Sequence, residues 1–331
     1  MQIPESQTAV VITAAGGPDV LKPETVAVEA PGPGEVLIRV TAAGINRHDV
    51  HQRAAGRHSD GKAVPGLEVA GTIASLGADV SGLAEGDRVM ALVQGGGYAQ
   101  YVVANAALVL PAPDQLSDLE AAGFPEAAFT SWWNFFHLMS LEKDQFALFH
   151  GGTSGVGHIA IQAMSALGYK VIATAGSDRK IEAAKSFGAL AAFSYRDPDL
   201  AGKVMEATGG AGISALLDVS AGAHVDQDIR MMAADGQIAH LSGGGGADLS
   251  VPLRDVMAKR VRITGSLLRP LPLDRKARVA DHIRREVLPL LGTQVRPVVA
   301  QQFDFRDAAK AHHAMEANDH IGKIMLSVTH D

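Results

Sequence analysis

Cysteine is absent from the 331-residue chain, and this absence removes several kinds of chemistry at once. Without cysteine there is no disulfide framework, no thiolate nucleophile and no zinc site built on thiolates. Aromatic residues are also scarce, at 5% of the sequence, whereas hydrophobic residues reach 47%. This balance is typical of a globular α/β protein whose core is built from aliphatic side chains.

Long hydrophobic runs and an excess of positive charge are missing as well. No apolar stretch reaches the roughly 18 residues that a membrane span needs, and the N-terminus shows no charged-then-apolar signal pattern. The formal net charge of −7 provides no basic footprint for nucleic acid. We therefore expect a cytoplasmic protein that does not bind membranes and whose main task is not nucleic-acid recognition.

The chain is long enough for two domains, and its pattern changes along its length. From about residue 7 to 109, short apolar strands alternate with glycine and proline turns, which predicts a mostly antiparallel domain. Ser117 and Glu120 have the spacing of a capping box and predict a helix start. From residue 146 to 267 the sequence alternates strand and helix, with six candidate strands of a parallel sheet. The tail from 295 to 328 predicts strand, helix and strand that fold back onto the first domain.

A glycine-rich turn organises the second region. The apolar run 146–149 predicts a buried strand, and the sequence Gly152-Thr153-Ser154-Gly155-Val156-Gly157 follows it and opens a helix. Small residues here let a pyrophosphate approach backbone N–H groups at a helix N-terminus. The strand expected at 171–174, after Gly168, completes a βαβ unit, which favours a dinucleotide site over a plain flexible loop.

The end of that second strand carries the choice of cofactor. Sites for NAD place Asp or Glu there, but Ala175 stands at this position. Ser177 and Lys180, or Arg179, are suited to bind a ribose 2′-phosphate, so the sequence predicts NADPH. Alternatively, Ser177 only caps the following helix and the basic side chains are a solvated face.

Together these residues resemble a known family. The glycine-rich turn, Ala43-Gly-Ile-Asn-Arg-His-Asp, Gly66-Leu-Glu-Val-Ala-Gly, Gly86-Asp-Arg-Val, Gly95-Gly-Gly-Tyr and His320-Ile-Gly-Lys look like the medium-chain dehydrogenase/reductase superfamily. Within it they are most similar to the zinc-independent quinone oxidoreductase branch, which contains zeta-crystallin. The resemblance implies an α/β protein, with a GroES-like catalytic domain at 1–122 and 269–331 and a doubly wound Rossmann domain at 123–268.

The family's roles can be transferred to matching positions of this sequence. The resemblance implies that the nicotinamide cofactor contacts Asn46, Thr130, Gly152, Thr153, Ser154, Gly155, Val156, Gly157, Ser177, Lys180, Tyr195, Ser242, Gly243, Gly244, Ser266, Leu267, Leu268 and Lys323. It identifies no catalytic residue. Candidates for the substrate pocket are Asn46, Arg57, His58 and Trp132, where Arg57 or His58 replaces a tyrosine that relatives often carry. A cation there would favour a polar or anionic acceptor.

The resemblance also bears on metal. At the positions that hold catalytic zinc in relatives, this chain has Asn46 and Leu67, so we expect no metal. His48, Asp49 and His51 lie close together in sequence, but no third-ligand motif accompanies them, and a solvated helix face is the more frequent role of such a pair.

The expected activity is NADPH-dependent transfer of hydride to a quinone. Alternatives are reduction of the double bond of an alkenal or enoyl substrate, and NADPH binding with little turnover as a sensor or structural protein. His48, His58 and Tyr98 are candidate proton donors, with solvent as the alternative. Because the strand expected at 261–267 would form a sheet edge, we expect a homodimer, with a tetramer as the alternative.

Overall fold

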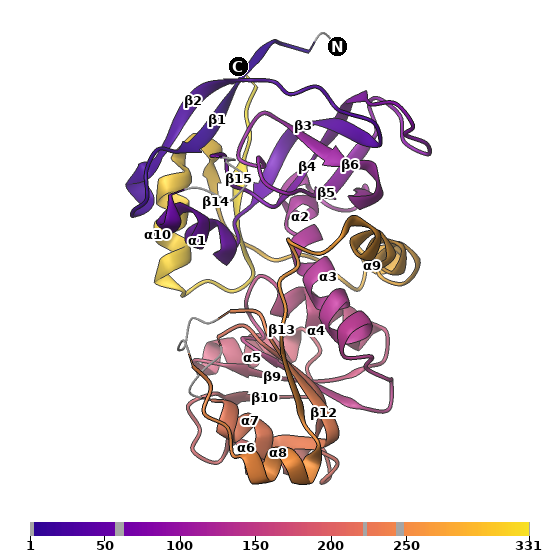
Figure 1. Ribbon diagram of the computed structural model, residues 1–331, viewed down its shortest axis with the longest axis vertical. Helices are drawn as coiled ribbons and strands as arrows, with labels where there is room; N and C mark the ends of the chain where they lie inside the picture. The colour runs from indigo at the N-terminus through magenta and orange to yellow at the C-terminus, as the bar shows by residue number, and fades with distance from the viewer. Residues whose placement is uncertain (1–2, 57–62, 221–223, 243–247, 331) are drawn as a thin grey trace. The chain divides into compact units, whose positions relative to one another are not determined.

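A computed structural model describes residues 3–56, 63–220, 224–242 and 248–330. The chain forms two compact units, one made of Met1–Phe129 with Lys276–Asp331 and the other of Thr130–Arg275. Each unit is built around its own sheet, and the chain has the α/β class expected (Figure 1). None of the helices in the described ranges has the length and hydrophobicity to cross a bilayer.

The first unit holds a seven-stranded sheet in the order β14-β15-β3-β4-β5-β7, with β6 paired to β3, and a separate hairpin β1-β2. All of its strand pairs are antiparallel except β14 with β15. The strands are β1 (Ser6–Ile12), β2 (Leu21–Ala27), β3 (Glu35–Gly44), β4 (Glu68–Leu76), β5 (Arg88–Leu92), β6 (Tyr101–Asn105), β7 (Val109–Pro111), β14 (Val299–Asp304) and β15 (Lys323–Ser327). The helices are α1 (Arg47–Ala55), α2 (Asp118–Ala122) and α10 (Ala308–Ala317), and both α3 (Pro125–Trp132) and α9 (Leu273–Glu286) cross the division between the units.

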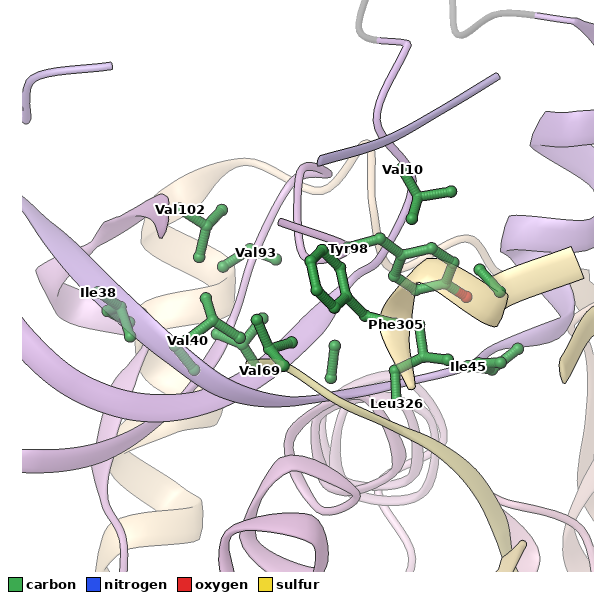
Figure 2. Packing of buried hydrophobic residues seen from close by; sticks show 14 of the residues in the cluster. Val10, Ile38, Val40, Ile45, Val69, Val93, Tyr98, Val102, Phe305 and Leu326 are labelled. Carbon is green, nitrogen blue, oxygen red and sulfur yellow. The ribbon is translucent and has the colours of Figure 1, made fainter. Parts of the chain in front are cut away.

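The core of this unit joins residues from both ends of the chain. Val10 of β1, Tyr98, and Phe305 and Leu326 of the tail belong to one buried cluster (Figure 2). β15 pairs with β3, so the tail is part of the first unit's sheet, as the sequence predicted. Burial of such apolar surface, at about 25 cal/mol per Å², is the main force that holds these distant segments together.

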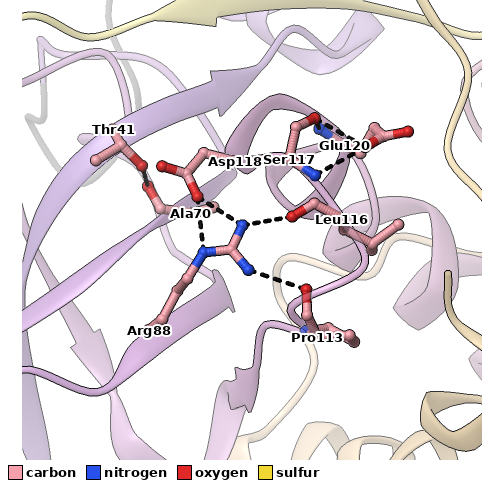
Figure 3. A network of polar contacts seen from close by, with 8 residues as sticks. All are labelled: Thr41, Ala70, Arg88, Pro113, Leu116, Ser117, Asp118 and Glu120. Carbon is pink, nitrogen blue, oxygen red and sulfur yellow. Dashed lines mark hydrogen bonds and ion pairs between the residues drawn. The ribbon is translucent and has the colours of Figure 1, made fainter.

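Polar contacts of Arg88 anchor the segment that leads from β7 to α2. The Arg88 guanidinium donates to Asp118 Oδ1 from Nε (2.9 Å) and Nη2 (2.7 Å), and to the carbonyls of Pro113 and Leu116 (Figure 3). Ser117 and Glu120 make the predicted capping box at the start of α2. The chain from β7 to α2 is therefore anchored to β5.

The second unit contains a six-stranded parallel sheet in the order β10-β9-β8-β11-β12-β13, and its order reverses between β8 and β11. Its strands are β8 (Phe146–His150), β9 (Lys170–Ala175), β10 (Ala191–Ser194), β11 (Ile213–Asp218), β12 (Met232–His240) and β13 (Arg262–Gly265). The helices are α4 (Gly157–Ala166), α5 (Asp178–Ser186), α6 (Leu200–Ala207), α7 (Val225–Met231) and α8 (Leu253–Lys259), and the π-helix η3 (Trp133–Leu138) continues from α3. This is the doubly wound arrangement whose ligands bind at the carboxyl ends of the strands beside the reversal.

The six predicted parallel strands are all confirmed. The sequence favours 237–241 for the fifth of them, but β12 begins earlier, at Met232. The run Tyr98-Ala-Gln-Tyr-Val-Val favours a strand that begins at Tyr98, but β6 begins three positions later, at Tyr101. β2, β7 and α8 were not predicted. These three elements have weak sequence signals, because β7 is short, β2 is largely exposed and α8 buries no residue.

Candidate functional site

The glycine-rich turn forms a cradle of backbone groups between β8 and α4. Ser154 Oγ accepts a hydrogen bond from the Gly157 N–H (3.0 Å), which fixes the turn at the helix start. Within the described chain, the amides of Gly155 and Val156 have no acceptor. A Cβ on Gly157 would lie 2.5 Å from the Gly151 carbonyl oxygen and 2.9 Å from the Gly152 Cα, so only glycine permits this close packing. Two unpaired amides at a helix N-terminus in such a turn fit the pyrophosphate of a dinucleotide.

The end of β9 carries the groups predicted to select the cofactor. Ser177 is the N-cap residue of α5, but its side chain makes no capping hydrogen bond, so the alternative role as a helix cap does not describe its hydroxyl. Ser177 is exposed and Lys180 half-buried. Tyr195 lies across from this strand end, since a Cβ on Gly176 would meet the Tyr195 hydroxyl at 2.7 Å.

Arg196 belongs to the same group and was missed in the sequence. Its Nη1 donates to the Gly176 carbonyl (3.0 Å) and its Nη2 to the Tyr195 hydroxyl (3.2 Å). The guanidinium is exposed and lies 5.1 Å from the Tyr195 ring centroid. Its position directly after Tyr195 was the only available signal. These contacts hold the positive charge of Arg196 beside Gly176, the residue that precedes Ser177.

The residues predicted around the nicotinamide follow β12 and β13. Ser266 is buried, its N–H donates to the His240 carbonyl (2.9 Å) and its hydroxyl accepts from Trp133 Nε1 (3.1 Å). Leu268 is buried, whereas Leu267 is 66% exposed. Ser242 follows β12, and Gly243 and Gly244 lie outside the described residues. Thr130 is buried in α3, and its carbonyl accepts from Asn134 Nδ2 (2.7 Å).

In the first unit, Asn46 and Lys323 meet at a buried carboxylate. Glu68 is fully buried, and its Oε1 accepts from Asn46 Nδ2 (2.9 Å) and from the Lys323 ammonium. Lys323 also donates to Asn46 Oδ1 (2.7 Å), and the backbone N–H of Glu126 donates to Glu68 Oε2 (2.8 Å). The structure therefore brings together two predicted cofactor residues, because Asn46 is hydrogen-bonded to both members of the Lys323–Glu68 ion pair. Asn46 Nδ2 has a second N–H beyond the one that it donates to Glu68.

A chain of hydrogen bonds holds this group from behind. Asp49 accepts from the backbone of Asn46 (2.8 Å) and Gly66 (3.2 Å) and from the Tyr98 hydroxyl (2.9 Å). His312 lies 3.3 Å from both the Tyr98 hydroxyl and Arg53 Nη1. Because a guanidinium can only donate, His312 Nδ1 accepts, and its Nε2–H donates toward Tyr98. Burial, reinforced by the charge of Arg53, lowers the pKa of His312 to about 3, so this ring is neutral.

The predicted substrate-pocket residues have different outcomes. Trp132 is completely buried beside Phe136, with ring centroids 5.0 Å apart, a position that favours packing over substrate contact. Asn46 is buried in the ion-pair group described above. Arg57 and His58 lie outside the described residues. The role of each in substrate binding stays a prediction.

The alternative metal site finds no support in the described ranges, where no group of three or more His, Cys, Asp or Glu side chains converges. Asp49, the central carboxylate of the His48-Asp49-His51 sequence, instead binds two backbone amides and a phenol.

Comparison with known proteins matches residues 32–114 to the model for an alcohol dehydrogenase GroES-like domain and residues 155–283 to that for a zinc-binding dehydrogenase. Rat quinone oxidoreductase is 29% identical over 317 residues, and the match covers 94% of each chain. A solved NAD-dependent alcohol dehydrogenase is similar with a TM-score of 0.83 and 29% identity, over 97% of this chain and 100% of that one. A mycobacterial protein solved in complex with NADPH is similar with a TM-score of 0.82 and 27% identity, over 97% of this chain and 99% of that one.

The buried Asp49 carboxyl gives the stability of the first unit a pH dependence. Burial raises the pKa of Asp49 from 3.8 to about 6, although hydrogen bonds from Asn46, Tyr98 and Gly66 oppose the shift. The folded chain therefore binds a proton more tightly than the unfolded chain. Between about pH 4 and pH 6 this group makes the free energy of unfolding fall as pH rises, by about 3 kcal/mol in total.

We expect Asp49→Asn to abolish this slope. The free energy of unfolding of the variant minus that of the parent, measured by urea unfolding, should rise by about 3 kcal/mol from pH 4 to pH 7. Asp304→Asn is the control, because the hydrogen bond from Arg306 lowers the pKa of Asp304. For Asp304→Asn the same difference in free energy of unfolding should fall as pH rises, and it should do so at lower pH, where Asp304 titrates. A pH-independent difference for Asp49→Asn would show that Asp49 is not the titrating group.

Proposed function

Because the chain belongs to the medium-chain dehydrogenase/reductase superfamily, we propose that it is an NADPH-dependent oxidoreductase that reduces a quinone-type acceptor without zinc. The observation that carries the proposal is the glycine-rich turn, whose two unpaired amides fit a pyrophosphate and which follows the central strand β8. The likeness to quinone oxidoreductases over nearly the whole chain supports the acceptor class. When bound, the cofactor supplies the hydride.

The preference for NADPH is supported by the end of β9. Ala175 is buried where an acidic residue would bind the hydroxyls of NAD, and Ser177, Lys180 and Arg196 surround the following turn. Hydroxyl and cationic donors of this kind bind a ribose 2′-phosphate, which carries the charge that NADH lacks.

The absence of zinc is supported by the group around Glu68. Lys323 is a buried cation that already neutralises this carboxylate, and Asn46, bonded to both, is a poor ligand for zinc. In this proposal the chain holds the acceptor and cofactor in a fixed orientation, and protons come from solvent.

A homodimer and a cytoplasmic location belong to the same proposal. β13 is the last strand of its sheet, and Leu253 and Met257 of the adjacent α8, together with Leu267, are exposed. Pairing of two copies at this edge would cover these side chains. Light scattering should therefore give twice the 34.5 kDa chain mass, and Met257→Glu should lower it. A parent protein with the mass of a single chain contradicts the dimer.

The cofactor preference can be tested by equilibrium binding. We expect NADPH to bind at least tenfold more tightly than NADH, and Arg196→Leu and Lys180→Leu each to weaken NADPH about tenfold while leaving NADH unchanged. Arg230→Leu is the matched control, because Arg230 is an exposed arginine of α7 paired only locally with Asp226. Equal affinity for the two cofactors in the parent protein contradicts the preference.

The acceptor class can be tested by turnover. Oxidation of NADPH is followed with a panel of quinones and a panel of alkenals and enoyl thioesters, before and after dialysis against a chelator. We expect quinones to give the higher kcat/KM and chelation to leave it unchanged. Higher kcat/KM for the activated alkenes would identify a double-bond reductase, and binding without oxidation by any acceptor would favour a sensor or structural role.

A further inference from the structure

A row of polar residues ends four neighbouring parallel strands of the second unit. His150 ends β8 and is in register with Thr174 of β9, and Asp218 ends β11 and is in register with His240 of β12. Since Phe149 and Leu217 are also in register, the row continues from one pair to the next. Residues in register on parallel strands share a sheet face, so these side chains form one polar edge at the carboxyl ends of the strands.

At the His150 end of this row, both ring nitrogens have partners within the chain. His150 Nδ1 lies 2.7 Å from Thr174 Oγ1, and Nε2 lies 2.9 Å from Asp228 Oδ1. Burial opposes the charged form of the ring, but Asp228 outweighs it and raises the pKa of His150. Both ring nitrogens have partners within the chain, so His150 has no need of a ligand.

The His240 end is different. His240 Nδ1 lies 3.1 Å from Asp218 Oδ2, while Oδ1 of the same carboxylate accepts from the N–H (2.7 Å) and hydroxyl (2.9 Å) of Ser220. A carboxylate can only accept, so His240 Nδ1 carries a proton, and in the tautomer protonated at Nδ1 alone Nε2 is an acceptor. The His240 side chain is only 9% exposed, and its Nε2 is buried and has no partner among the described residues. A buried acceptor without a donor is costly, which points to a donor from outside the described residues, such as a bound ligand.

The position of His240 identifies which part of a dinucleotide would supply that donor. The strand order reverses between β8 and β11, and a dinucleotide binds across this point with one half on each side. Ser177, Lys180 and Tyr195 follow β9 and β10 and suit the adenosine end. β12 lies on the other side of the reversal, so its carboxyl end faces the nicotinamide half.

We propose that His240, held by Asp218, accepts at Nε2 a hydrogen bond from the nicotinamide riboside half of the bound cofactor, either from the carboxamide N–H or from a ribose hydroxyl. This inference rests on the proposed function, because it requires a dinucleotide in the second unit. It assigns His240 as a positioning residue for the half of the cofactor that carries the hydride. Asp218 acts through His240, because it fixes which ring nitrogen accepts.

Two substitutions separate the contact from the pairing with Asp218. The amide nitrogen of asparagine mimics Nδ1, so His240→Asn keeps the bond to Asp218 and removes the distal acceptor. His240→Gln places an amide near the position of Nε2. We expect His240→Asn to weaken binding of the preferred dinucleotide about tenfold and to leave its adenosine fragment, 2′,5′-ADP or 5′-ADP, unchanged. His240→Gln should stay within about threefold of the parent for both.

The 3-acetylpyridine analogue of the dinucleotide lacks the carboxamide N–H and identifies the donor. If the parent and His240→Asn bind this analogue equally, the donor is the carboxamide; if the tenfold difference persists, the donor is a ribose hydroxyl. Equal effects of His240→Asn on the dinucleotide and its adenosine fragment, or no effect on either, would overturn the proposal. If the parent binds neither NADPH nor NADH, the proposed function fails instead.

A measurement on the unmodified protein covers the case in which the variants do not fold. The ¹⁵N shift of His240 Nε2 should move when the dinucleotide binds and stay constant when only the adenosine fragment binds. The His150 ring, with both nitrogens already partnered, serves as the internal control and should show neither change. An unchanged His240 signal in the dinucleotide complex contradicts the contact.

Discussion

The first unit depends on the neutralisation of one buried carboxylate. Glu68 is fully buried, and an unpaired charge in such a place would cost several kcal/mol. The chain offsets this cost with Lys323 from the last strand, the Asn46 amide from the start of α1 and a backbone N–H from α3. Four segments that are far apart in sequence must therefore reach one point before the unit is stable.

That requirement also orients Asn46, which the sequence predicts to contact the cofactor or the substrate. Asn46 is fixed through its side chain by Glu68 and Lys323 and through its backbone by Asp49. Asp49 is in turn held by Tyr98, and the order of donors from Arg53 through His312 to Tyr98 is determined because a guanidinium cannot accept. An amide held at both ends presents its remaining hydrogen-bonding capacity in one direction, which is how a site is preorganised without a metal.

Much of the second unit could be predicted from the sequence because its signals are local. The six strands are short apolar runs, and the glycine turn has a spacing that backbone geometry demands. The capping box of Ser117 and Glu120 in the first unit is an equally local signal. In contrast, the pairing of Glu68 with Lys323 depends on tertiary structure, and no pattern in either segment indicates it. β2 was missed because Leu21 is its only fully buried residue, and α8 because it buries none.

The polar residues at the strand ends could be predicted from the sequence only in part. Asp218 and His240 fall within strands that were predicted, and a polar residue at the carboxyl end of each of two neighbouring strands was a usable signal. Their being neighbours was not visible from the sequence alone, because it follows from the strand order. Whether a ring nitrogen has a partner is a still finer property, and it distinguishes His240 from His150 even though both end a strand of the same sheet.

The contacts of Tyr98 make it a poor source of the proton for the proposed reduction. Tyr98 was a candidate donor, but its hydroxyl already donates to Asp49. Burial and the neighbouring Asp49 charge raise the pKa of Tyr98 well above 10. A phenol whose proton is committed to a buried carboxylate, and whose ionised form is this unfavourable, is a weak acid at neutral pH. Tyr98 is thus better suited to hold Asp49 in place than to protonate a substrate. Since reduced quinones take protons readily from water, delivery from solvent needs no side chain in that role.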